Sequence, residues 1–94
     1  MPSATRRCYI VSFQVALPAT RPALVERMKT YPAYCPINRN CWAIMTEQKA
    51  AEIRDHLSQA LRPGDRLFVI RSGTEAAWRN AFGPKNSEWL KSNL

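Results

Sequence analysis

Histidine, cysteine and acidic residues are scarce in this sequence of 94 residues, and each scarcity excludes a kind of site. The one histidine, His56, cannot form a histidine pair or a histidine-rich metal site within a single chain. The three cysteines show no C-x-x-C spacing, which argues against a zinc knuckle and against a disulfide framework. We therefore expect no metal site made of histidine and cysteine.

Long apolar runs are also missing. No run approaches the roughly 20 residues that a membrane-spanning helix needs. The first residues, "MPSATRRC", contain a basic pair but not the small-residue cleavage site of a secretory signal. Because 46% of the residues are hydrophobic, disorder is not expected either. The sequence predicts a single cytoplasmic domain over residues 1–94, without a membrane partner.

The shortage of acidic residues leaves a strong positive charge. Fourteen lysines and arginines face seven aspartates and glutamates, which gives a net charge of +7. Such a balance suits attraction to phosphate groups and says little about the fold. We expect RNA or DNA, contacted through its backbone, as the favoured partner.

The order of predicted elements indicates the fold class. A strand at "CYIVSFQV" precedes a helix that begins near Thr20, and "AYCPINRNCWAIMT" has the pattern of a hairpin. A second helix, "EQKAAEIRDHLSQAL", precedes the strand "RLFVIR", and a short helix is expected from Ser87. The resulting α+β, ferredoxin-like βαββαβ order predicts a four-stranded antiparallel sheet with two helices on one face. The core would span about 7–72, with a C-terminal appendage over about 73–94.

Alternation along the first strand predicts what each face of the sheet contacts. Large apolar residues are expected to face the helices: Tyr9, Val11, Phe13 and Val15. The opposite face would carry Ile10, Ser12 and Gln14, which we expect to face a partner subunit across a dimer cleft, a ligand or the C-terminal appendage. The strand "RLFVIR" is expected beside the first strand, in the centre of the sheet.

Charged residues near strand ends are the candidate functional residues. The candidates for contact with nucleic acid are Arg6, Arg7, Arg39, Arg66 and Arg71. If they cluster, they would track a phosphate backbone without reading bases, and the alternative is a solvated rim. Among the acids, Asp65 is expected to fix the Pro63–Gly64 turn, and Glu75 follows the last strand. One carboxylate is a weak magnesium site, although a dimer could bring two together.

Four segments carry a resemblance to known proteins: "PINRNCWAIMT", "TEQKAAEIRDHL", "GDRLFVIRSG" and "SEWLKSNL". They resemble small bacterial proteins related to the second core CRISPR-associated protein, the dimeric small subunit of the spacer-acquisition complex. Many of these proteins are named only as SinR-like or hypothetical, and the virulence-associated protein D toxins look like more distant relatives. The resemblance runs from about Arg7 to Leu94, and its most specific pieces are the "CW-I-T" junction and the "D-LFV" strand.

The resemblance implies a function that depends on one position. In nuclease-competent relatives the first strand ends in an aspartate, and the aspartates of two subunits hold a divalent metal. Here the matching residues are Phe13 and Gln14, and a neutral amide cannot replace a carboxylate as a magnesium ligand. We therefore expect a homodimeric nucleic-acid-binding scaffold without metal-dependent cleavage and without a cofactor.

Two other functions stay open at this point. One is a toxin-like endoribonuclease that uses magnesium or manganese, with Glu75 or Asp65 supplying the acid. The other is a protein-binding module of mobile-element origin that engages a CRISPR or toxin component. Chelator-sensitive cleavage would favour the first, and a stable protein partner without nucleic acid would favour the second.

Overall fold

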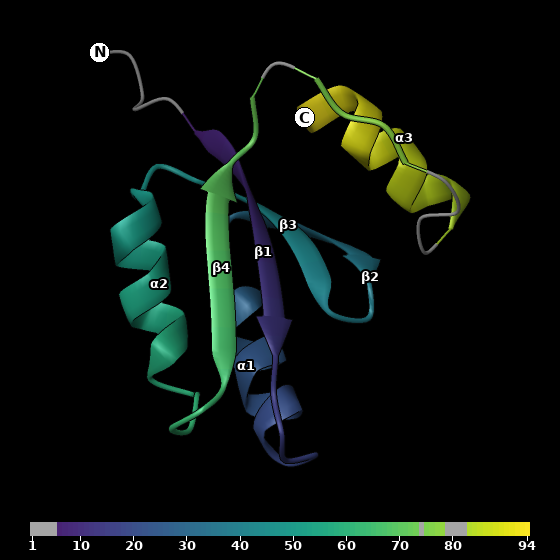
Figure 1. The fold of residues 1–94 in the computed structure, drawn as a ribbon. Coiled ribbons are helices and arrows are strands. Elements are labelled where there is room, and N and C mark those ends of the chain that lie inside the picture. The colour runs from purple at the N-terminus through teal and green to yellow at the C-terminus, as the bar shows by residue number, and fades with distance from the viewer. Residues whose placement is uncertain (1–5, 74, 79–82) are drawn as a thin grey trace.

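Four strands and three helices are present in residues 6–73, 75–78 and 83–94, the part of the chain that the computed structural model describes. In chain order they are β1 (Arg7–Gln14), α1 (Thr20–Met28), β2 (Ala33–Asn38), β3 (Cys41–Thr46), α2 (Ala50–Ser58), β4 (Arg66–Arg71) and α3 (Pro84–Asn93). Figure 1 shows the sheet with α3 set apart from the other two helices.

The strands form one antiparallel sheet in the order β2-β3-β1-β4. This order, with α1 and α2 as the crossover helices, is the predicted ferredoxin-like arrangement. The prediction that "RLFVIR" is a central strand is wrong. A strand has two edges for pairing, and β1 pairs with β3 on one edge and β4 on the other. Among the described residues β4 pairs with β1 alone, so β4 lies at the edge of the sheet.

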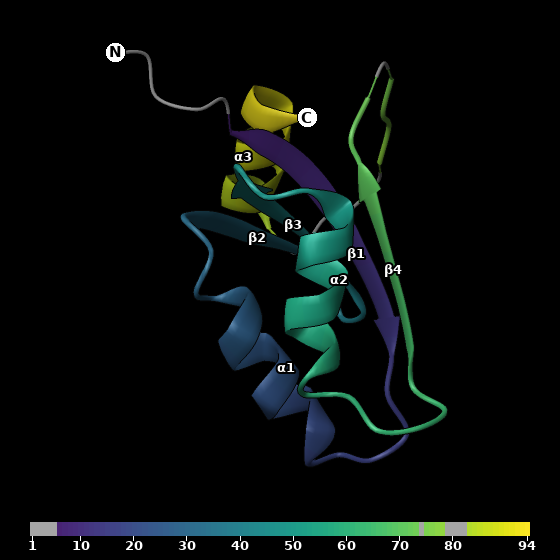
Figure 2. The same ribbon diagram turned by 90° about the vertical axis from the view of Figure 1, so that its left-hand side faces the viewer.

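The main core lies between the sheet and helices α1 and α2, which cover one face (Figure 2). The predicted alternation along β1 is confirmed, because Tyr9, Val11 and Phe13 are all buried on this side. The helices contribute Leu24 from α1 and Leu57 from α2, both fully buried. Burying a side chain of this size stabilises the fold by about 1.5–3 kcal/mol, so this face supplies much of the stability.

Helix α3 covers part of the opposite face. Leu90 is fully buried in a second cluster with Cys8, Cys35 and Ala43. The side-chain amide of Asn86 donates a 2.8 Å hydrogen bond to the carbonyl oxygen of Pro36 on β2, which ties the first turn of α3 to the sheet. The C-terminal appendage is thus a packed third layer over the β2–β3 side of the sheet.

The helix begins earlier than the sequence predicts. We expected it from Ser87, whereas α3 starts at Pro84. Proline suits the first turn of a helix, because its fixed φ is already helical and its missing N–H would have no partner there. Gly83 precedes it as the N-cap residue.

The β1–β4 side of this face is not covered by α3. Phe68 and Ile70 on β4 are 60% and 49% exposed, although both are large and apolar. They are in register with Ser12 and Ile10 of β1, so they lie on the face that the sequence assigns to a partner, a ligand or the appendage. An apolar area of this kind on a small domain often marks a binding surface.

Removing the Leu90 side chain tests whether α3 is an integral layer. We expect Leu90→Ala to lower the free energy of unfolding by about 2–5 kcal/mol, the usual cost of such a truncation in a core. Burial raises the pKa of the Cys8 and Cys35 thiols, which keeps them protonated and unreactive at neutral pH. Loosening α3 should therefore speed their reaction with a disulfide reagent.

Urea unfolding and thiol labelling of the native protein measure the two effects. Lys91→Ala is the matched control, since this neighbouring side chain is exposed. Equal urea midpoints for the two variants, with the thiols of Cys8 and Cys35 unreactive in both, would show that the packing of α3 contributes little to stability.

Candidate nucleic-acid interface

The C-terminal end of β1 borders a pocket of about 360 Å³ that contains two arginines. Gln14 is the last residue of β1, Arg21 lies in the first turn of α1, and Arg39 and Asn40 form the β2–β3 turn. The turn after β1, residues 15–18, completes the lining. Three segments that are distant in sequence thus bring polar and cationic side chains to one end of the sheet.

Arg21 is held in place by contacts on several sides. Its guanidinium donates hydrogen bonds to the side-chain oxygen of Asn40, at 3.1 Å, and to the carbonyl oxygen of Arg39. It also lies over the ring of Phe13, 5.4 Å from the centroid, in a cation–π contact. These contacts leave some of its five N–H groups free, so a fixed guanidinium is presented to the pocket.

The β2–β3 turn that carries Arg39 is itself fixed to β1. The backbone N–H of Phe13 donates to the carbonyl oxygen of Asn40 at 3.0 Å. The N–H of Asn40 donates to the side-chain oxygen of Asn38 at 3.0 Å, which stabilises the turn expected at these asparagines. The position of Arg39 relative to Arg21 therefore follows from the sheet itself.

The electrostatics of this pocket favour an anion. Burial and the nearby charge of Arg39 both lower the pKa of Arg21, which remains cationic at neutral pH. No carboxylate is among the described residues that line the pocket. The carboxylate of Asp65 accepts a hydrogen bond from the N–H of Ala16 at the edge of the pocket, but neither arginine forms an ion pair among the described residues. The two cations therefore repel each other, and a bound phosphate would relieve that repulsion.

Arg66 adds a third cation at the same end of the sheet. It is the first residue of β4 and is directly opposite Gln14 in the β1–β4 register. Residues opposite each other in a register lie on the same face, so Arg66 and Gln14 extend from the partly uncovered face next to the pocket. We call Gln14, Arg21, Arg39 and Arg66 the arginine site.

The other predicted arginines lie at the far end of the sheet. Arg6 and Arg7 are at the start of β1, and Arg71, at the end of β4, is in register with Tyr9. β1 has eight residues, so roughly 20 Å separates them from the arginine site. The five arginines predicted from the sequence therefore form two groups rather than one groove, with Arg39 and Arg66 at one end.

The two candidate acids are also far apart. Asp65 precedes β4 and Glu75 follows it, so the whole strand lies between them. Asp65 accepts hydrogen bonds from the backbone N–H groups of Arg62, at 2.9 Å, and Ala16, at 3.1 Å. It fixes the expected turn and also ties that turn to the end of β1. Among the described residues, no three histidine, cysteine or acidic side chains are close enough to hold a metal ion.

The predicted cleft residues share one face but differ in surroundings. Ile10 is half-buried and borders a separate pocket beside α3, which also contains Glu75. Ser12 and Gln14 are exposed on the side that α3 does not cover. Ser12 is opposite Phe68, so the exposed part of this face combines polar and apolar groups.

Sequence reasoning missed Arg21. It falls in the first turn of the helix that the sequence predicts from near Thr20. In this topology the β1–α1 loop and the β2–β3 turn lie at the same end of the sheet. Arg21, just after the β1–α1 loop, and Arg39, in the β2–β3 turn, are therefore brought together. An arginine in each of these two segments is the sequence feature that predicts their proximity.

Comparison of the sequence with family models and with curated proteins, and of the structure with solved structures, found no match. No helix in the described part of the chain has the length and apolar character to cross a membrane.

The structural role of Asp65 has a measurable consequence. Asp65→Ala removes the acceptor for two backbone N–H groups, and we expect the free energy of unfolding to fall by about 1–3 kcal/mol. Glu75→Ala removes the same charge from an exposed residue and should change it by less than about 0.5 kcal/mol. Urea denaturation of both variants checks this. Equal midpoints would mean that Asp65 is not a structural residue.

Proposed function

We propose that the protein is a cytoplasmic, homodimeric scaffold that binds RNA or DNA through the phosphate backbone, of the small-subunit type that its sequence resembles. The observation that carries the proposal is the pair of arginines in one pocket, Arg21 and Arg39, without a carboxylate in the lining. A fixed guanidinium suits a phosphate because its N–H groups match two phosphate oxygens. The net charge of +7 draws a polyanion toward this surface from a distance.

The proposed scaffold does not cleave its ligand with a metal ion. Gln14 occupies the place of the metal-binding aspartate in the resemblance, and its amide would be surrounded by cations that repel a metal ion. The same amide can donate a hydrogen bond to a phosphate or sugar oxygen. Replacing a carboxylate by an amide next to arginines thus favours binding of the anion over metal-dependent chemistry.

Binding of labelled RNA and DNA, single- and double-stranded, over a series of salt concentrations tests the proposal. We expect Arg21→Ala and Arg39→Ala each to weaken binding about tenfold, because each removes a charged hydrogen-bond donor to phosphate. Each should also reduce the slope of log K against log salt by about one. Arg54→Ala is the control: it removes the same charge from α2, where Arg54 pairs with Asp55 at 2.9 Å.

A further variant separates charge from geometry. Arg21→Lys keeps the cation and loses the planar group that contacts Asn40 and Phe13, so we expect intermediate affinity and an unchanged salt slope. Equal affinity of the Arg54→Ala and Arg39→Ala variants would reject the arginine site. Cleavage in magnesium or manganese that EDTA stops and Glu75→Ala abolishes would instead make the protein an endoribonuclease.

Association of two chains is supported by the uncovered part of the sheet face. Phe68 is 60% exposed there, beside Ser12 and Ile70. A chain of this size buries a limited fraction of its apolar surface, so covering this area with a second copy adds stability. Two copies would bring two arginine sites into one particle and so extend the surface available to a nucleic acid.

A charge placed on this face should break the dimer. We expect Phe68→Glu to sediment as a monomer, because association would bury an unpaired carboxylate. Ala51→Glu is the control, with the same charge on the exposed side of α2. Sedimentation equilibrium measures the mass, and a dimeric Phe68→Glu variant would mean that this face is not the interface.

A further inference from the structure

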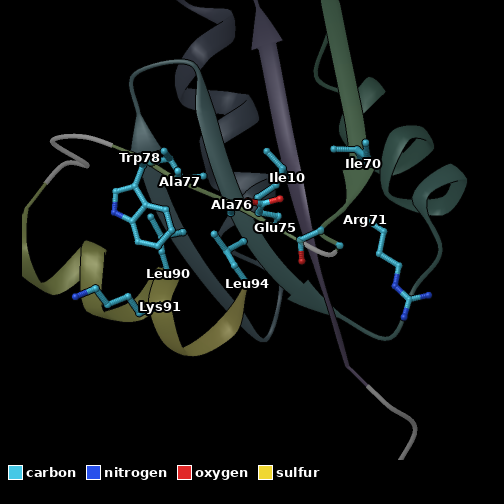
Figure 3. A pocket seen from close by; sticks show the side chains of 13 residues that line it. Ile10, Ile70, Arg71, Glu75, Ala76, Ala77, Trp78, Leu90, Lys91 and Leu94 are labelled. Atoms are coloured by element: carbon cyan, nitrogen blue, oxygen red, sulfur yellow. The ribbon is translucent and has the colours of Figure 1, made fainter.

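A second pocket, of about 490 Å³, lies between α3 and the uncovered part of the sheet (Figure 3). Ile10 and Ile70 border it from the sheet, and Leu90 of α3 and Leu94, which follows that helix, border it on the other side. Pockets that hold small molecules commonly have volumes of about 300–1,000 Å³ and mostly apolar linings. By size and lining, this pocket suits a small molecule with an apolar body.

This pocket differs from the arginine site in having a carboxylate in its lining. Glu75 lines the pocket, and Figure 3 shows its carboxylate among the apolar side chains. Arg71 and Lys91 also border the pocket, but their charged ends extend away from its apolar residues. The ion pair found among the described residues, Arg54 with Asp55, does not involve Glu75. Within the described part of the chain this carboxylate forms no ion pair, and it is the group in the pocket that would pair with a cation on a ligand.

Trp78 supplies an aromatic wall of the pocket. Its ring borders the pocket, and its indole N–H donates a 3.4 Å hydrogen bond to the hydroxyl of Ser87 on α3. Figure 3 shows the ring nitrogen on the side away from Ile10 and Leu94. The carbon part of the ring is thus turned toward the cavity, where it offers an apolar surface to the body of a ligand.

We propose that this pocket binds a small amine with an apolar body, in which the protonated nitrogen pairs with Glu75 and the body lies against Ile10, Ile70 and Trp78. The site is separate from the arginine site and does not depend on binding of nucleic acid. A net charge of +7 favours anions over the protein as a whole. A preference for an amine over an acid of the same shape can therefore come only from groups local to the pocket.

Three probes of nearly equal shape test the proposal: phenethylamine, 2-phenylethanol and 3-phenylpropionate. The readout is the NMR signal of the Trp78 indole N–H, assigned with a Trp78→Phe variant. We expect saturable shifts, with the amine bound about two- to fivefold more tightly than the alcohol, as one exposed ion pair allows, and the acid bound most weakly. Titrations repeated in Phe68→Lys, whose cation cannot add to a preference for an amine, keep the pocket accessible whatever the state of association.

Three variants test whether the preference arises in the pocket. Glu75→Gln should bring the affinity for the amine down to that for the alcohol, while Glu88→Gln, which removes an equal charge from the exposed side of α3, should keep the preference. Ile70→Ser should weaken binding of amine and alcohol alike. The proposal is overturned if the Trp78 signal does not shift saturably, if amine and alcohol bind equally to the wild type, or if Glu88→Gln acts as Glu75→Gln does.

Discussion

The structure depends on the two-sided burial of β1. This strand pairs with β3 and β4 along its edges, packs against α1 and α2 on one face, and meets α3 near its start on the other. A residue of β1 is therefore fixed relative to several parts of the chain at once. Gln14, the last residue of β1, is fixed in the same way. The hydrogen bond from the N–H of Phe13 to the carbonyl oxygen of Asn40 also fixes the β2–β3 turn relative to β1. Two members of the arginine site, Gln14 and Arg66, therefore lie on strands, and Arg39 lies in a turn that is hydrogen-bonded to β1.

The periodic spacing of apolar residues predicted the fold well, because it depends on the geometry of each strand or helix alone. Period-two burial along β1 and apolar spacing along the helices were sufficient to indicate the sheet and its helical face. The edge position of β4 was not predicted, because "RLFVIR" is as apolar as a central strand. The apolar residues Phe68 and Ile70 are exposed in the single chain, and a strand sequence does not show which partner its apolar face meets.

The candidate site was predicted only in part, and the reason is topological. Arg39 and Arg66 were identified from the sequence and lie near Gln14, but Arg6, Arg7 and Arg71 lie a strand length away. Position near a strand end does not say which end of the sheet a residue occupies, because neighbouring strands run in opposite directions. Arg21 was missed since its partners, Asn40 and Arg39, come from a turn almost twenty residues later. The resulting chain has a cationic pocket at one end of the sheet and an acid-containing apolar pocket beside α3.

The edge position of β4 has a consequence for the behaviour of the protein in solution. An edge strand with apolar side chains presents backbone groups that another chain can pair with, which is a common start of aggregation. Arg66 and Arg71 stand at its two ends, so a second β4 aligned with the first in either direction would place like charges close together. The two arginines at the ends of β4 therefore disfavour pairing of one β4 strand with another. Salt that screens them would weaken this protection while leaving the apolar side chains between them unchanged.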